Sequence, residues 1–118
     1  MSFRACARYV RNPDLPFHTR LSAVRSCALH LSTLLKKENR SDVLDPITHA
    51  YNLNDPNGPT EQELLSALAV LERNREAFLN RLRAFEQKRV EEKYAGIRWP
   101  SEDEITQLYD FDLDLDLR

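Results

Sequence analysis

A segment without proline or glycine extends from Thr60 up to Gly96 and limits the fold of this chain more than any other feature. It opens with Thr60-Glu61-Gln62-Glu63, a capping box. In this motif the threonine hydroxyl accepts from the Glu63 amide, and the Glu63 side chain accepts from the Thr60 amide. Gly96 suits the left-handed residue that follows a helix end. A helix over 60–95 would run for roughly 34 residues and 50 Å, which exceeds the width of a domain of this mass.

The composition favours helices over strands. Eighteen Leu and ten Ala stand against five Val and three Ile, and β-branched residues prefer strands whereas Leu and Ala prefer helices. The 118 residues amount to one domain. We therefore expect an all-α fold, a single small helical bundle over 1–109, followed by an acidic-apolar tail over 110–118 (the tail).

Three short helices are predicted ahead of the long one, in a basic helical part over 1–51. Ser2 can cap the first helix, whose apolar face would consist of Phe3, Cys6, Ala7 and Val10. Apolar residues at intervals of three or four predict the second helix over 19–37. Asp45 followed by Pro46 is typical of a helix start and predicts the third helix there. Upstream, Val43 and Leu44 could add one more turn.

Turn residues separate the long helix from its neighbours. Residues 52–59 include Asp55-Pro56 and Asn57-Gly58-Pro59, which is the composition of an irregular linker. After the long helix, a second capping box begins at Ser101 and predicts a short helix over 101–109.

The long helix carries a seam with the 4-3 spacing of a coiled coil. The seam residues are Leu64, Leu68, Leu71, Arg75, Phe78, Leu82, Phe85 and Arg89. The purely apolar first half is expected to pack within the chain, and the charged second half to be solvated or bound to a partner. We interpret Phe78, Leu82 and Phe85 as helix-pairing residues that would permit a homodimer. The alternative is an ordinary bundle helix packed on the second helix.

Charge is divided unevenly along the chain: residues 1–40 carry a net charge of +6, and residues 41–118 carry −8. The basic part could contact nucleic acid through five arginines. These candidate contacts are Arg4, Arg8, Arg11, Arg20 and Arg25. In that reading the tail would act as an autoinhibitory mask. The alternatives are a solvated basic face, or a tail that lies near the first helices of its own chain.

Acidic and apolar residues alternate strictly through the tail. In an extended chain, alternate side chains point to opposite sides, whereas on a helix the same residues would form no face. We predict that the extended tail adds to a sheet edge of a protein partner. The contacts would be apolar at Phe111, Leu113, Leu115 and Leu117, with steering charges at Asp112, Asp114 and Asp116. The alternative is a disordered solubilising tail.

Two short resemblances favour recruitment of a regulatory partner. Leu113-Asp114-Leu115-Asp116-Leu117 resembles the LxLxL repression motif of plant transcriptional repressors, which recruits a corepressor. Asp110-Phe111-Asp112-Leu113 is similar to part of viral acidic transactivation segments. The resemblances cover five and four residues, and they imply recruitment without identifying a family.

Catalytic and metal chemistry find little support in the sequence. Two glycines exclude the glycine-rich loops that bind nucleotide phosphates. Cys27 and His30 are spaced to share a metal, but nothing supplies a compact ligand set. The Asp45 carboxylate could orient the His49 imidazole for base catalysis, yet no nucleophile is brought into line. We therefore expect no enzyme activity, no cofactor and no metal site.

No apolar run approaches the roughly 20 residues of a membrane span, and two cysteines without a pattern are typical of a reducing compartment. These features predict an intracellular protein, cytoplasmic or nuclear. The basic first 37 residues leave mitochondrial import as an alternative. The sequence therefore favours a non-enzymatic protein-interaction adaptor. A nucleic-acid-binding protein is the second hypothesis, and a subunit or regulator of a larger assembly is the third.

Overall fold

The computed structural model describes residues 1–96 and 101–116, which form five α-helices and no strand. The helices are α1 (Phe3–Arg11), α2 (Phe17–Leu34), α3 (Ser41–Tyr51), α4 (Glu61–Tyr94) and α5 (Glu102–Tyr109). The predicted all-α class is confirmed, together with the long helix, the short following helix and the extended tail. The molecule measures 58 × 26 × 24 Å, and its length follows from α4.

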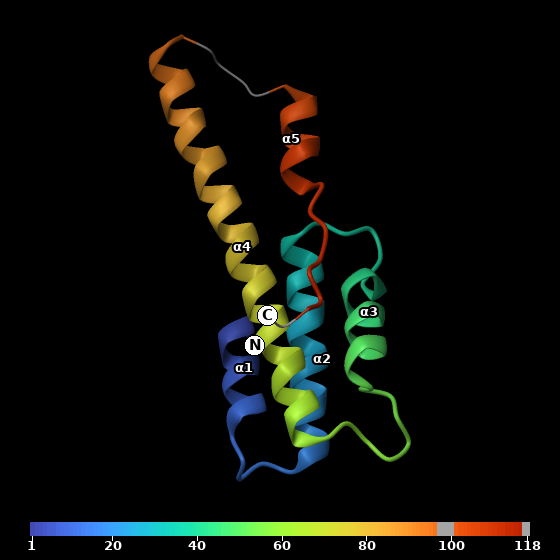
Figure 1. Ribbon diagram of the computed structural model, residues 1–118. Helices are drawn as coiled ribbons and strands as arrows, with labels where there is room; N and C mark the ends of the chain where they lie inside the picture. Colours follow the sequence, from blue (N-terminus) through green and yellow to red (C-terminus); the bar gives the residue numbers. More distant parts are fainter. Residues whose placement is uncertain (97–100, 117–118) are drawn as a thin grey trace.

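Successive helices run in alternating directions, and α2 lies at the centre of the bundle (Figure 1). α1, α3 and the first half of α4 pack against α2. α5 returns beside the second half of α4, as Figure 1 shows. The end of α4 extends beyond the bundle, where Tyr94 is 90% exposed.

The core is formed by the apolar faces that helical periodicity predicts. In α1 the buried residues are Phe3, Cys6, Ala7 and Val10, which are the four residues of the expected face. In α2 and α4, residues such as Leu31, Leu64 and Leu68 are fully buried. The first half of the predicted seam therefore packs within the chain, because its spacing keeps one stripe of α4 toward α1, α2 and α3.

α2 ends three residues before the predicted end at Lys37. Lys36 adopts a left-handed conformation with φ of 52°, and its amide donates to the Thr33 carbonyl at 3.1 Å. The Lys37 amide donates to the Ser32 carbonyl, also at 3.1 Å. This pair of bonds is a Schellman motif. Lysine here occupies a position that usually holds glycine, which is why the sequence pattern missed the helix end.

α3 begins at Ser41, ahead of the start predicted at Asp45-Pro46, and includes the additional turn at Val43 and Leu44 that the sequence allowed. The Asp42 carboxylate in the first turn of α3 accepts from the Asn39 amide at 3.3 Å, just ahead of the helix. Pro46 lies inside the helix, where it lacks the amide that would donate to a preceding carbonyl. The helix persists because it buries Val43 and Ile47 on either side of the proline.

The caps of α4 follow the prediction. Both hydrogen bonds of the capping box at Thr60 and Glu63 are present, and Gly96 follows the helix end with φ of 85°. The Ser101 hydroxyl accepts from the Glu104 amide at 3.2 Å and caps α5. Local capping chemistry therefore sets both ends of α4 and the start of α5.

Candidate functional site

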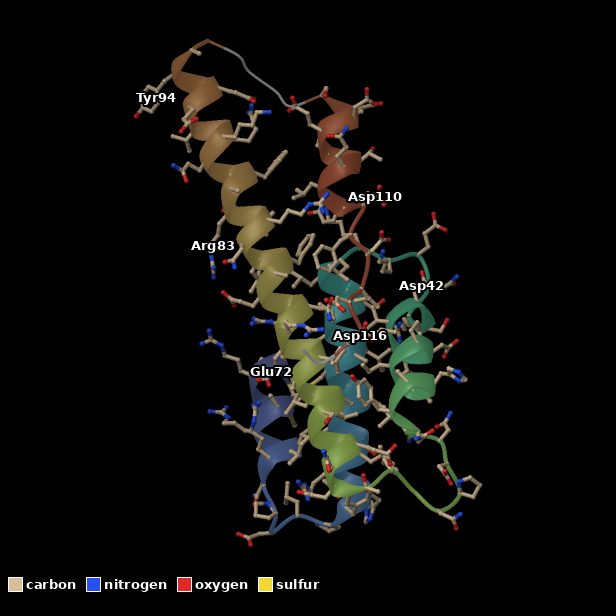
Figure 2. All side chains as sticks on the ribbon, in the orientation of Figure 1. Asp42, Glu72, Arg83, Tyr94, Asp110 and Asp116 are labelled. Atoms are coloured by element: carbon tan, nitrogen blue, oxygen red, sulfur yellow. The ribbon has the colours of Figure 1, made fainter. Side chains whose placement is uncertain are left out.

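The tail returns onto its own bundle. After α5 it continues in an extended conformation across α2, between α4 and α3 (Figure 1). Phe111, Leu113 and Leu115 are half-buried against the core. Asp110, Asp112, Asp114 and Asp116 are exposed, and Figure 2 shows Asp110 at the end of α5 and Asp116 between α4 and α3. The predicted alternation is therefore realised against the chain's own helices. Leu117 lies outside the described residues.

Asn74 of α4 binds the backbone of the tail. Its side-chain nitrogen donates to the Asp114 carbonyl at 2.8 Å, and its side-chain oxygen accepts from the Asp114 amide at 2.9 Å. The same nitrogen donates to the Val70 carbonyl at 2.8 Å. Asn74 is only 3% exposed. One buried amide thus pairs both backbone groups of a tail residue, as a neighbouring β-strand would do.

Three further side chains hydrogen-bond to carbonyls of the tail. Lys37 donates to Phe111 at 3.1 Å, and the Tyr51 hydroxyl donates to Leu115 at 2.7 Å. Arg73 donates to the carbonyl of Asp114 at 3.0 Å and to that of Asp116.

Electrostatics adds to this backbone binding. The guanidinium of Arg73 lies 3.4 Å from the Asp114 carboxylate, an exposed pair that adds up to about 1 kcal/mol. Burial raises the pKa of Tyr51, so its hydroxyl stays protonated and able to donate. The positive charges of Lys37 and Arg73 are therefore complementary to the acidic tail, while most hydrogen bonds go to the backbone of the tail.

An aromatic cluster joins α4, α5 and the tail. The Phe78 ring centroid lies 5.7 Å from that of Tyr109 and 5.6 Å from that of Phe111, with the Phe111 ring nearly perpendicular at 85°. The Lys36 ammonium lies 4.6 Å from the centroid of the Tyr109 ring. Phe78 has no exposed surface. The face proposed for helix pairing is covered at this residue by the chain's own α5 and tail.

The other two residues predicted to pair helices, Leu82 and Phe85, lie along the contact with α5. Leu82 is half-buried and packs against the core, and Phe85 lines a small pocket of about 210 Å³ between α4 and α5. Arg81 donates to the carbonyl of Gln107, and Lys88 lies 3.6 Å from Glu104. Pairing of two copies through all three residues would require α5 and the tail to move.

Two of the five arginines predicted to contact nucleic acid, Arg20 and Arg25, hydrogen-bond to backbone carbonyls of the fold. Arg20 is 5% exposed and donates to the Val10 carbonyl and to both Glu61 oxygens, each at 2.7 Å. The hydrogen bonds from Arg20 lower the pKa of Glu61. Arg25 donates to the Leu53 carbonyl at 3.1 Å and holds the loop before α4.

The remaining three arginines are brought together on one surface. Arg4, Arg8 and Arg11 of α1 line a cleft of about 490 Å³ with Arg75 of α4; we refer to it as the arginine cleft. The cleft also contains Phe3, Ala7, Glu72 and Glu76. Arg11 forms an ion pair with Glu72, and the Arg75 guanidinium lies 5.0 Å from the centroid of the Phe3 ring. The tail hydrogen bonds described above come instead from Lys37 after α2, from α3 and from α4.

The residues considered for metal and catalytic chemistry are not gathered into one site. Cys27 is buried whereas His30 is exposed, and burial raises the pKa of the Cys27 thiol to about 12. Asp45 and His49 line an open cleft on α3 of about 500 Å³. Within residues 1–96 and 101–116, no three His, Cys, Asp or Glu side chains are grouped to hold a metal ion. No helix in the described part of the chain is long and apolar enough to cross a membrane.

Sequence reasoning missed the residues that receive the tail, and one signal was present. Asn74 lies three residues after Leu71 and four before Phe78, a spacing that puts all three on one helix face. A lone amide on an apolar face needs hydrogen-bond partners. The sequence does not say that those partners come from the tail, 40 residues away.

No protein-family model, curated protein or solved structure matches this chain. The candidate functional features of the chain are the tail, the surface that receives it and the arginine cleft.

Proposed function

We propose that this chain is a non-enzymatic protein-interaction adaptor, and that its tail recruits a protein partner. The observation that carries the proposal is the pairing of both backbone groups of Asp114 by the buried Asn74 amide. Recognition through the backbone is how extended peptides bind to sheet edges and grooves. The tail thus has the conformation that such a partner would receive.

Exchange of the tail between its own bundle and a partner is energetically reasonable. Phe111, Leu113 and Leu115 are only half-buried, and each hydrogen bond between the bundle and the tail backbone contributes about 0.5–1.5 kcal/mol. A partner that offers comparable contacts can compensate for the loss of these contacts. Release of the tail would uncover Phe78, whereas core residues such as Leu31, Leu64 and Leu68 lie where α1, α2, α3 and α4 pack on one another.

The test compares four full-length chains as baits in affinity capture from the native cell, with and without nuclease. The first is the wild type. In the second, Asn74→Ala frees a tail whose own residues are unchanged, and in the third, the double variant Leu113→Asp/Leu115→Asp destroys the apolar face of the tail. The fourth is Asn80→Ala. Asn80 is an exposed asparagine on the same helix and serves as the control. We expect nuclease-resistant partners that increase with Asn74→Ala and disappear with the double variant. Identical partners for all four chains would contradict recruitment by the tail.

Nucleic-acid binding remains a second candidate because of the arginine cleft. Arg4 and Arg8 are exposed, and they line this cleft together with Arg11 and Arg75. Binding to phosphates through these residues would weaken steeply with salt. An RNA or DNA shift assay at several salt concentrations tests this, with Arg4→Ala/Arg8→Ala as the variant. Loss of a salt-sensitive shift in the variant would support the candidate, and no shift by the wild type would exclude it.

A further inference from the structure

We propose that the surface under the tail is itself a binding site for another protein, specifically for an extended segment with apolar residues at every second position. We call it the tail groove, and it is formed by Lys37, Tyr51, Arg73, Asn74 and Phe78. The tail is then an intramolecular competitor of this ligand. The inference rests on the proposed function, because it assigns a second binding element to the same interaction protein.

The tail groove binds main-chain atoms, which any extended peptide provides. The Asn74 side chain is buried and oriented by its bond to the Val70 carbonyl, so its remaining donor and its acceptor point to the carbonyl and the amide of one tail residue, Asp114. The Tyr51 hydroxyl binds the next carbonyl along the tail, that of Leu115. The hydrogen bonds from Asn74 and Tyr51 do not involve the side chains of the tail. The groove is therefore able to accept a segment from another protein.

The apolar contacts define which segments fit. Phe111 packs nearly perpendicular to the Phe78 ring, which favours an aromatic residue at the first apolar position. Leu113 and Leu115 occupy the following positions on the inner side and are half-buried. The ligand therefore has the order aromatic, any residue, aliphatic, any residue, aliphatic.

The outward positions are less restrictive. Asp112 and Asp114 are exposed, and the carboxylate of Asp114 accepts from the Asp116 amide of the tail itself and forms an exposed ion pair with Arg73. Such a pair contributes little, although two cations at the groove favour acidic residues over basic ones. The preferred ligand is an extended apolar segment with acidic residues between its apolar positions.

Competition by the tail is strong because both partners belong to one chain. A short connection gives a tethered ligand an effective concentration in the millimolar range. A free peptide with the sequence of the tail thus competes poorly with the tethered tail for the groove. Release of the tail to a partner would open the groove to a second protein.

The first test measures binding of a fluorescent peptide with the sequence of residues 110–118 by anisotropy. The chains are the full-length wild type, Leu113→Asp/Leu115→Asp, whose own tail is released, and that double variant with Asn74→Ala added. We expect at least tenfold tighter binding to the double variant than to the wild type, and at least a tenfold loss when Asn74→Ala is added. A peptide of the same composition with apolar and acidic residues grouped in blocks is the control, and it should not bind.

A second measurement needs no variant and covers the case in which the double variant fails to fold. Peptide added to the wild-type chain above the effective concentration of the tethered tail, in the millimolar range, should speed hydrogen exchange at the Asp114 amide of the chain's own tail. Equal binding to all chains, binding of the block peptide, or unchanged exchange would overturn the inference. A dimer formed by mutual exchange of tails would also overturn it, because the ligand would be a second copy. Recruitment of partners by the tail could still hold in each case, since it does not require an open groove.

Discussion

Replacing Asn74 with alanine should loosen the tail while leaving the bundle folded. The substitution removes two hydrogen bonds between the side chain and Asp114, at 2.8 and 2.9 Å. It also removes the bond to the Val70 carbonyl, but that carbonyl belongs to α4, so this bond is not a contact with the tail. Each bond to the tail contributes about 0.5–1.5 kcal/mol, so docking of the tail should weaken by about 1–3 kcal/mol. The equilibrium for docking then falls by a factor of about 5 to 150.

The assay is hydrogen exchange at the Asp114 amide by NMR. This amide donates to the Asn74 side chain, so its exchange should accelerate by about 5- to 150-fold in Asn74→Ala. Amides in the centre of α2 should exchange as slowly as in the wild type.

Asn80→Ala is the matched control for the change in helix propensity. Asn80 is exposed on α4 and accepts a hydrogen bond from Arg83 at 2.8 Å. Both substitutions gain roughly 0.5 kcal/mol of helix propensity, and only one of them touches the tail. Unchanged exchange at Asp114 in Asn74→Ala, or equal acceleration in both variants, would refute the reasoning.

Three further predictions concern the bundle itself. Phe78→Ala should destabilise the protein by about 3–5 kcal/mol in urea unfolding, because Phe78 is fully buried against Tyr109 and Phe111; wild-type stability would contradict this packing. Hydrogen bonds from Arg20 lower the pKa of Glu61 below its ordinary 4.5. The Arg20–Glu61 pair therefore stabilises the fold fully above pH 4.5, and this stabilisation is lost as the pH falls through the lowered pKa of Glu61. Glu61→Gln should therefore reduce the fall of the melting temperature with decreasing pH. The same dependence of the melting temperature on pH in this variant and in the wild type would contradict a stabilising Arg20–Glu61 pair. Burial raises the pKa of Cys27 to about 12, so iodoacetamide at pH 8 should alkylate this thiol only after urea is added. Mass spectrometry would detect the alkylation, and rapid alkylation without urea would contradict the burial of Cys27.

Local sequence patterns predicted most of the helices because their causes are local. The apolar face of α1 and the capping box of α4 each follow from residues within three or four positions of one another. The start of α3 was misplaced for the same reason. Asp45-Pro46 has the pattern of a helix start, but burial of Val43 and Ile47 extends the helix past the proline.

Long-range contacts account for what the sequence did not predict. Arg20 was expected on the surface, yet its partner Glu61 is 41 residues away at the start of α4. The alternation of the tail indicates an extended segment with one apolar side, but it does not identify the surface that this side meets. That surface combines residues of α4 with Tyr51 of α3 and Lys37 after α2, and no pattern within one element brings these together.

The central claim is that the tail docks in the groove of its own bundle, and NMR distance measurements on the wild-type chain test it most directly. The account predicts nuclear Overhauser effects between the rings of Phe78 and Phe111, whose centroids are 5.6 Å apart. It also predicts such effects between Tyr51 and Leu115, which share a hydrogen bond of 2.7 Å. Random-coil chemical shifts through residues 110–116, with no such effects to α3 or α4, would contradict it.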